Sequence, residues 1–390
     1  MKSIRDLKLE GRALFLRLDL NVPMKDGLVT SDARITAALP TIKYALEQGA
    51  RVALASHFGR PKGKRDPKDS LELVGGRLSE LLGREVIFSE DCVGDGVKGL
   101  MRDLRGGGLV LLENLRFHAG EEKNDADFAK ALAAPFEVYA NDAFGACHRA
   151  HASIVGMVRH CKDRGAGFLL DKEVGALGRL VDAPKKPFVA IVGGAKVADK
   201  LAVLGSLLGK ATTLCIGGAM AYTFLKAKGI EIGTSRVEED KLRDALDLLT
   251  RAKDRGVEIL LPTDHVTADT FAEKATAKIV GTQAIPAGQM GLDIGPETRK
   301  LYGATIARAE TVFWNGPMGV FEWDAFATGT SAVAAAVAAC RGFTVVGGGD
   351  SVAAIEKAGV ADKIGHVSTG GGASLEFVEL GSLPGIDALK

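Results

Sequence analysis

The stretch FVAIVGGAKVADKLAVLGSLLGKATTLCIGG, residues 188–218, contains two apolar runs, and a glycine pair ends each of them. The residues after the first pair have the pattern of a helix, so the stretch predicts strand, helix and strand in succession. Continuous apolar strands that alternate with amphipathic helices are typical of a parallel sheet that is covered on both faces. This stretch therefore predicts an α/β fold.

The same pattern recurs along the chain. It predicts strands over residues 13–20, 51–57, 85–89, 109–115, 137–142, 188–194, 212–218, 258–264, 311–316 and 343–349. The pattern restarts near residue 187, after a segment that reads as a helix over 168–183. We therefore expect two doubly wound, Rossmann-like parallel-sheet domains that face each other across a cleft and are joined by a helix. The expected bounds are 1–170, 171–186 for the linking helix and 187–375, with a tail of about 376–390 that returns to the first domain.

Composition excludes several classes of protein. The chain has 390 residues, which favours two domains over one core. Its net charge of +1 gives no general reason to expect nucleic acid or an acidic membrane as a partner. The five cysteines form no CxxC pair, which favours reduced thiols, and the N-terminus has no apolar signal core. We expect a soluble cytoplasmic protein.

Arginines recur near the predicted strand ends of the first half. The five candidates are Arg17, Arg34, Arg60, Arg116 and Arg149. Guanidinium groups bind phosphate and carboxylate through two parallel hydrogen bonds, so the set predicts a site for a small, highly anionic substrate. Ordinary salt bridges are the alternative for any single arginine. Arg17 is the weakest candidate, because it lies inside the strand and could brace an acid. We expect Arg17, Asp19 and Asn21 to alternate on one strand face.

Histidine and glycine motifs in the first half give weaker evidence for a binding site. His148 and His151 form HxxH with no intervening acid, so a zinc site is a poor interpretation. His57, in a turn with glycine, arginine and proline, is better placed to contact a ligand. The segment GDGVKG, residues 94–99, matches GxGxxG but follows a polar stretch and fails the context of a dinucleotide site.

Lys196 and Lys200 follow the glycine pair Gly193–Gly194, and we expect them to open the next helix on one face. Cations are unfavourable at a helix N-terminus unless an anion binds there, so the pair predicts a phosphate site. Two solvated lysines are the alternative interpretation.

Three further glycine-rich segments follow predicted strands of the second half. GGGDS, residues 347–351, places Asp350 where it could hold Mg²⁺ or act as an N-cap. STGGGASLEF, residues 368–377, could line a transferring phosphate with its amides. WNGPMGVFEWDAF, residues 314–326, could wrap an adenosine, with Glu322 on the ribose.

Taken together, these segments resemble phosphoglycerate kinases over essentially the whole chain. The resemblance rests on RLDLNVP, SHFGRPKG, ENLRFH, NDAFGACHRAHAS, GGAKVADK, GLDIGP, WNGPMGVFEWDAF, GGGDS, STGGGASLE and LPGIDAL, in this order. It implies a monomeric, hinge-bending glycolytic transferase that moves a phosphoryl group between 1,3-bisphosphoglycerate and ADP, giving 3-phosphoglycerate and ATP. Mg²⁺ would accompany the nucleotide, and no tightly bound organic cofactor, nucleic acid or membrane partner is implied.

The resemblance also implies a role for each site residue. Phosphoglycerate would be held by Asp19, Leu20, Asn21, Arg34, His57, Phe58, Gly59, Arg60, Arg116 and Arg149. The nucleotide would be held by Gly194, Ala195, Lys200, Gly217, Gly291, Leu292, Asn315, Pro317, Glu322, Gly348, Gly349, Asp350 and Ser351, with Asp350 on the metal. Arg34, Lys196, Lys200, Gly371 and Gly372 would act on the group in transfer.

Two departures from the family pattern are small. Ala146-Cys147 stands where Thr-Ala or Ser-Ala is usual, and Ser351 stands where Thr is frequent. Three other functions stay open at this point: a kinase for another phosphorylated acid, a nucleotide sensor without catalysis, and a dehydrogenase.

Overall fold

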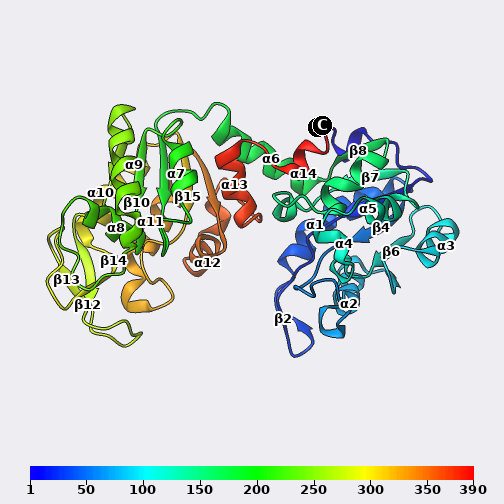
Figure 1. Cartoon of the computed structure of the whole chain (residues 1–390), viewed down its shortest axis with the longest axis horizontal. Coiled ribbons are helices and arrows are strands. Elements are labelled where there is room, and N and C mark those ends of the chain that lie inside the picture. Colours follow the sequence, from blue (N-terminus) through cyan, green and yellow to red (C-terminus); the bar gives the residue numbers. More distant parts are fainter. The chain divides into compact units, whose positions relative to one another are not determined.

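The computed structural model covers residues 1–390 and shows two compact units (Figure 1). Unit 1 comprises Met1–Gly175 and Ser382–Lys390, and unit 2 comprises Ala176–Gly381. The division falls within helix α6, Phe168–Val181, near the helix expected over 168–183. Residues Gly372–Leu380 form helix α13 of unit 2, so the part of the expected tail that belongs to unit 1 begins at Ser382.

Unit 1 contains a six-stranded parallel sheet in the order β5-β6-β4-β1-β7-β8. Its strands are β1 Ala13–Arg17, β4 Arg51–Ala55, β5 Ile87–Ser89, β6 Leu109–Leu112, β7 Val138–Asn141 and β8 Asp163–Ala166. Its helices are α1 Ala33–Glu47, α2 Glu72–Leu82, α3 Asp95–Asp103, α4 Ala119–Glu122, α5 Ala126–Ala133, a π-helix Ala152–Gly156 and α14 Pro384–Asp387. A two-stranded hairpin pairs β2 Met24–Lys25 with β3 Leu28–Val29.

Strand β1 shows why this sheet is buried on both faces. All five of its residues are buried, and Leu14 and Leu16 join one apolar cluster with residues of α1 and α2. Phe15 points to the opposite face, where its ring stacks on Tyr139 and meets the edge of Phe136. Because side chains alternate along a strand, apolar side chains are buried on both faces of the sheet. Each Å² of apolar surface removed from water stabilises the fold by about 25 cal/mol.

Unit 2 contains a second parallel sheet in the order β11-β10-β9-β15-β16-β17, which is the doubly wound 3-2-1-4-5-6 order. Its strands are β9 Phe188–Val192, β10 Thr213–Ile216, β11 Glu258–Leu260, β15 Thr311–Asn315, β16 Phe343–Gly347 and β17 His366–Val367. Its helices are α7 Leu201–Leu207, α8 Met220–Ala227, α9 Leu242–Asp254, α10 Pro296–Ala307, α11 Thr328–Ala339, α12 Gly349–Lys357 and α13. The strand order reverses between β9 and β15, where ligands bind in such sheets.

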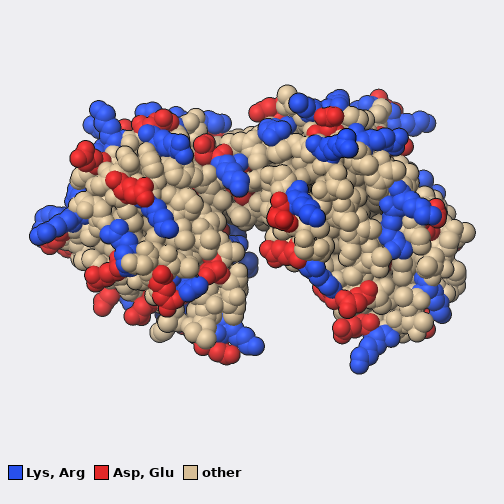
Figure 2. All heavy atoms as spheres, turned by 180° about the vertical axis from the view of Figure 1, so that it is seen from behind, with Lys and Arg blue, Asp and Glu red and all other residues tan.

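Unit 2 also carries a small antiparallel sheet, seen at the lower left of Figure 1. Its strands are β12 His265–Ala268, β13 Lys278–Val280 and β14 Met290–Ile294, in the order β13-β12-β14. None of the helices has the length and apolar character that a membrane span needs. On the face shown in Figure 2, basic and acidic side chains are interspersed over both units.

The predicted fold class is confirmed, since each of two domains holds a parallel sheet. All ten predicted strands are present, with ends within a few residues of the expected ones. The strands that the prediction missed are β8 and β17, which complete one edge of each sheet, and the short strands of the hairpin and the small sheet. Strand β8 has the sequence DRGA and β17 has two residues, so neither carries an apolar run.

Candidate functional site

The arginine set of unit 1 gathers at the carboxyl edge of its sheet. His57 follows β4, Arg116 follows β6 and Arg149 follows β7, while Arg17 is the last residue of β1. Carboxyl ends of parallel strands meet at one edge, so residues far apart in sequence come together there. The charges of Arg17, Arg34, Arg116 and Arg149 all act on His57, whereas Arg60 is exposed and is not among them. The structure therefore brings together four of the five predicted arginines.

The expected alternation of Arg17, Asp19 and Asn21 on one strand face is wrong, because β1 ends at Arg17. Asp19 and Asn21 lie in the loop that follows. The loop is held by its own polar contacts: Asp19 pairs with Arg34 Nη1 at 2.6 Å, and Asn21 Oδ1 accepts the Gly59 amide at 3.0 Å. The Leu20 amide donates to Ser56 Oγ at 2.9 Å. Arg34 is the second residue of α1.

Arg116 is the most constrained of the candidate substrate ligands. Its side chain is buried, Nη1 donates to the Gly59 carbonyl at 2.7 Å, and Nε lies 3.3 Å from Glu122 without hydrogen-bond geometry. The Phe58 amide donates to Asn114 at 3.1 Å, which fixes the same turn. Burial and then the charge of Arg149 lower the pKa of Arg116, so its guanidinium stands in an environment that favours an anion.

The histidines at this edge report the same positive field. Burial, followed by the charges of Arg17, Arg116, Arg149 and Arg34, holds the pKa of His57 well below its usual value. Burial and neighbouring arginines lower the pKa of His151 to about 4. Burial and Arg149 also lower the pKa of His148. These rings are neutral near pH 7, and the positive charge of the edge comes from its arginines.

The segment that links β9 to α7 differs from its prediction. Lys196 and Lys200 do not open a helix together, because α7 begins at Leu201 and Lys200 is its N-cap. Glu238 accepts the amides of Val197 and Ala198 and ties the intervening segment down as a loop. Lys196 is therefore an exposed loop residue, while Lys200 stands half-buried at the helix start.

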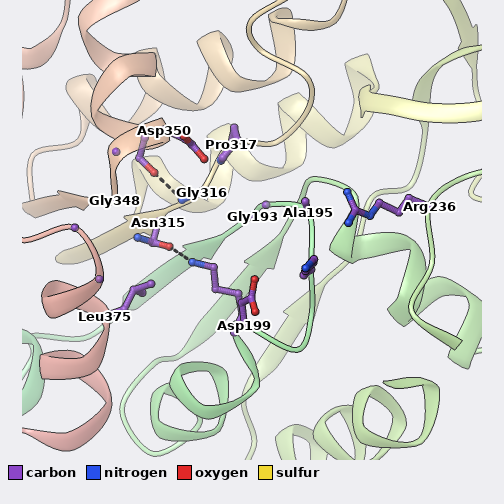
Figure 3. A pocket seen from close by; sticks show the side chains of 17 residues that line it. Gly193, Ala195, Asp199, Arg236, Asn315, Gly316, Pro317, Gly348, Asp350 and Leu375 are labelled. Carbon is purple, nitrogen blue, oxygen red and sulfur yellow. Dashed lines mark hydrogen bonds between the residues drawn. The ribbon is translucent and has the colours of Figure 1, made fainter. Parts of the chain in front are cut away.

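Lys200 is oriented by a residue from the next strand across the switch point. Its Nζ donates to Asn315 Oδ1 (Figure 3). Asn315 Nδ2 donates to the Gly347 carbonyl at 2.7 Å. Burial lowers the pKa of Lys200, and the charges of Asp199 and Asp350 oppose that effect. Asn315 thus aligns the ammonium group with the loop after β16.

These residues line a polar pocket of about 460 Å³ at the switch point of the unit 2 sheet (Figure 3). Its lining contains Gly193, Gly194, Ala195, Lys196, Asp199, Lys200, Arg236, Asn315, Gly316, Pro317, Gly348, Gly349, Asp350, Ser351, Gly371, Gly372 and Leu375. Gly193, Asp199, Arg236, Gly316 and Leu375 were not among the predicted site residues. Arg236 lies in a segment without a strand or glycine motif, so no sequence signal marked it. Ser351 is buried, and its Oγ accepts the Gly316 amide at 2.6 Å.

A second, more apolar pocket of about 470 Å³ adjoins the first and shares Gly194, Ala195, Arg236, Pro317 and Asp350 with it. The predicted residues Gly291, Leu292 and Glu322 line it, and so do Tyr222, Phe271, Met290 and Val320, which the sequence did not indicate. Gly217 does not line either pocket, because it packs against Met318, and Gly218 lines the second pocket in its place. Asn315 belongs to the polar pocket, away from the predicted adenosine wrap.

Asp350 is a carboxylate that fits a magnesium ion at the polar pocket. It lies in the first turn of α12, is exposed and lines both pockets. Mg²⁺ is usually held by one or two carboxylates together with substrate phosphates and water. A different cluster of possible metal ligands, Asp91, Cys92 and His118, lies in unit 1. There His118 Nε2 and Asp91 already share a hydrogen bond of 2.7 Å.

Comparisons with known proteins agree over the full chain. The family model described as "Phosphoglycerate kinase" matches residues 4–380. A phosphoglycerate kinase of Anaeromyxobacter sp. (strain K) is 57% identical over 393 residues, covering 100% of this chain and 99% of the relative. One from Moorella thermoacetica is 55% identical over 387 residues, covering 99% and 98%. The solved structure of the Coxiella burnetii phosphoglycerate kinase superposes with a TM-score of 0.92 at 42% identity, covering 100% and 98%.

Proposed function

Because the chain belongs to the phosphoglycerate kinase family, it is a phosphotransferase of glycolysis, and we propose that its two sheet edges divide the two substrates between them. The family's reaction moves a phosphoryl group between 1,3-bisphosphoglycerate and ADP, giving 3-phosphoglycerate and ATP. Unit 1 takes the phosphoglycerate and unit 2 takes the nucleotide. The observation that carries this division is the pair of adjoining pockets at the switch point of unit 2, one polar and one apolar.

The two pockets suit the two ends of a nucleotide. The polar pocket offers Lys196, Lys200 and glycine backbone to phosphates, whose oxygens accept charge-assisted hydrogen bonds. The apolar pocket offers Leu292 and Met290 to a base, and the exposed carboxylate of Glu322 stands at the same pocket for the ribose hydroxyls. Nucleotide sites commonly combine apolar walls with a few placed polar groups.

The unit 1 edge suits a small acid that carries several negative charges. Arg34, Arg116 and Arg149 supply guanidinium groups, and Asp19, Asn21 and His57 supply polar groups around them. Leu20, Phe58, Gly59 and Arg60 belong to the same loops and complete the proposed set. A planar guanidinium binds carboxylate and phosphate through two donors, which gives orientation as well as affinity.

The chemistry needs no covalent enzyme intermediate and no general base, because the attacking carboxylate or ADP oxygen is already ionised. Catalysis then consists of alignment and charge neutralisation. Arg34, Lys196 and the amides of Gly371 and Gly372 neutralise the group in transfer, and Lys200 holds the nucleotide phosphates. Since we assign the substrates to different units, we propose that a hinge-bending closure brings them into line for direct transfer.

Mg²⁺ would be held at Asp350, and when bound it supplies positive charge that neutralises the nucleotide phosphates. The Ser351 hydroxyl accepts a hydrogen bond from the Gly316 amide and so holds the neighbouring loop. Asp350 therefore remains as the proposed metal ligand on α12. We propose no tightly bound organic cofactor.

We also propose that the protein works as a cytoplasmic monomer without nucleic-acid or membrane partners. Five free cysteines, four of them buried, are compatible with a reducing compartment. On the face shown in Figure 2, the interspersed basic and acidic side chains form no broad basic patch for nucleic acid.

The decisive experiment is a coupled assay of ATP consumption that depends on 3-phosphoglycerate, with a panel of other phosphorylated acids beside it. We expect turnover with 3-phosphoglycerate well above that with any other acid. Preference for another acid would identify a related kinase, and MgADP binding without turnover would indicate a sensor. A dehydrogenase function would require NADH binding, and we expect no NADH binding.

A further inference from the structure

We propose that Arg17 is a positioning residue that holds His57 as the neutral tautomer with its proton on Nε2. In this state His57 presents one directed N–H donor to the anionic substrate and adds no charge. The inference deepens the proposed function of the unit 1 edge and rests on it for its catalytic meaning. The tautomer itself can be measured without any substrate.

The contact between Arg17 and His57 determines the tautomer. Arg17 Nη2 lies 3.3 Å from His57 Nδ1, and both side chains are buried. A guanidinium group carries donors only and stays protonated in proteins, so it cannot accept a hydrogen bond. His57 Nδ1 must therefore be the acceptor and carry no proton. In a neutral imidazole the proton then resides on Nε2.

Arg17 is itself held rigidly from the other side. Its Nε donates to Ser153 Oγ at 2.9 Å, and Nη1 donates to the Leu18 carbonyl. Ser153 lies on the π-helix and donates from Oγ to Glu121 Oε1 at 2.5 Å and from its amide to Oε2 at 2.9 Å. Arg17 is 1% exposed and Glu121 is fully buried. Glu121, Ser153, Arg17 and His57 thus join α4, the π-helix, β1 and the loop after β4 into one polar network.

The surroundings also keep His57 neutral. The charges that face it are Arg17, Arg116, Arg149 and Arg34, and together with burial they hold its pKa well below the usual value. His57 Nε2 has no protein hydrogen-bond partner, so this atom remains for a ligand. A cationic ring among four arginines would have to be desolvated beside like charges, whereas a neutral donor costs far less.

The first test is nitrogen NMR of the ligand-free protein labelled with ¹⁵N-histidine, between pH 5.5 and 8. We expect a pyridine-type shift at His57 Nδ1 and a pyrrole-type shift at Nε2 throughout. In Arg17→Met we expect a mixture of tautomers and a raised pKa. A protonated Nδ1 in the wild type, or an unchanged Nδ1 shift in Arg17→Met, would overturn the proposal.

Two further variants keep this test interpretable. Removing Arg17 takes from the buried Glu121 the charge that lowers its pKa most. The double variant Arg17→Met/Glu121→Gln therefore carries the same expectation if the single variant does not fold. Arg12→Met is the matched control, because Arg12 precedes the same strand and pairs with Asp163 at 2.7 Å. We expect the His57 shifts of this control to equal those of the wild type.

The second test measures enzyme activity. It asks whether His57 acts on the substrate as a neutral N–H donor at Nε2 or through a positive charge. Glutamine places its amide N–H near the position of Nε2, whereas asparagine places it near Nδ1. We expect His57→Gln to keep KM for 3-phosphoglycerate within about 10-fold of the wild type, and His57→Asn and His57→Ala to raise it about 10- to 100-fold. Equal losses in all three variants would overturn the donor role. Absent turnover in the wild type would refute the proposed function and leave the NMR result unaffected.

Discussion

The two sheet edges have the same architecture but offer different groups to bind anions: side chains in unit 1 and mostly backbone in unit 2. At the edge of unit 1 the candidate ligands are long side chains, such as Arg116 and Arg149, on the segments that follow separate strands. At the edge of unit 2 seven of the seventeen residues that line the polar pocket are glycines, so backbone forms much of its wall. A compact acid with several charges suits guanidinium groups, whereas a phosphate chain suits rows of amides with a few lysines.

This contrast predicts which changes damage each unit. Side-chain truncation is expected to damage the unit 1 edge, while added Cβ atoms are expected to damage the unit 2 edge. The two lysines of the polar pocket are the exception, because they supply the charge that backbone amides lack.

The largest effect is expected from Lys196→Ala. Lys196 is exposed, so we expect an unchanged Tm and a kcat lower by about 10²- to 10³-fold, as for loss of one preorganised transition-state donor. Steady-state kinetics in the coupled assay measure this loss. Lys253→Ala, an exposed lysine of α9 away from both pockets, is the control. Near-normal kcat in Lys196→Ala would remove Lys196 from catalysis.

A buried carboxylate gives unit 2 a pH dependence of its own. Asp293 Oδ2 accepts the Gly329 amide at 2.6 Å, Oδ1 has no partner, and desolvation raises the pKa to about 7. The unfolded chain binds fewer protons than the folded one between pH 4 and 7, so stability falls as the pH rises through this window. We expect a loss on the order of 2–3 kcal/mol between pH 5 and 8.

Urea unfolding at both pH values, followed by hydrogen exchange at the α11 amides, measures this loss. Asp293→Asn should abolish most of it. In unit 1, burial raises the pKa of Asp142 to about 6, so Asp142→Asn should remove a smaller loss, on the order of 1 kcal/mol. Equal pH profiles for the wild type and Asp293→Asn would contradict the assignment.

A glycine substitution tests whether backbone approach matters in unit 2. Gly218 has a φ of +67°, and a Cβ there would lie 2.5 Å from the Gly194 amide nitrogen. We expect Gly218→Ala to lower stability by about 2 kcal/mol and to weaken MgADP binding, measured by thermal unfolding and calorimetry. Gly229→Ala has a φ of +77° and open space around its Cβ, so it isolates the conformational cost. Equal MgADP affinity in the two variants would argue against the contact.

The smallest effect is expected at Arg60. This arginine belongs to the set predicted from the sequence but not to the four arginines that lie together in the structure. Arg60 is exposed and forms no ion pair, so Arg60→Ala should raise KM for 3-phosphoglycerate by less than about fivefold, below about 1 kcal/mol. Arg116→Ala should raise it more, since that guanidinium is buried. A larger KM change for Arg60→Ala than for Arg116→Ala would reverse this ranking.

Sequence reasoning found much of this molecule because its signals are local. Ten strands carry apolar runs of five to eight residues, and glycine pairs end the runs that form β9, β10 and β16. The edge strands β8 and β17 were not predicted. Each is only partly buried, and such a strand needs no continuous apolar run. The helix predicted to begin at Lys196 failed because Glu238, far along the chain, holds that segment as a loop.

The sequence by itself determined the two-domain α/β class, the family and the types of residue that could hold anions. The tertiary structure alone decided which of them lie together. Arg17 is tied to Ser153, 136 residues away, and Lys200 to Asn315, 115 residues away. Local periodicity encodes burial and secondary structure, but the order in which strands pair decides which distant side chains meet. That order turns one conspicuous arginine into a buried brace and leaves another, Arg60, in solvent.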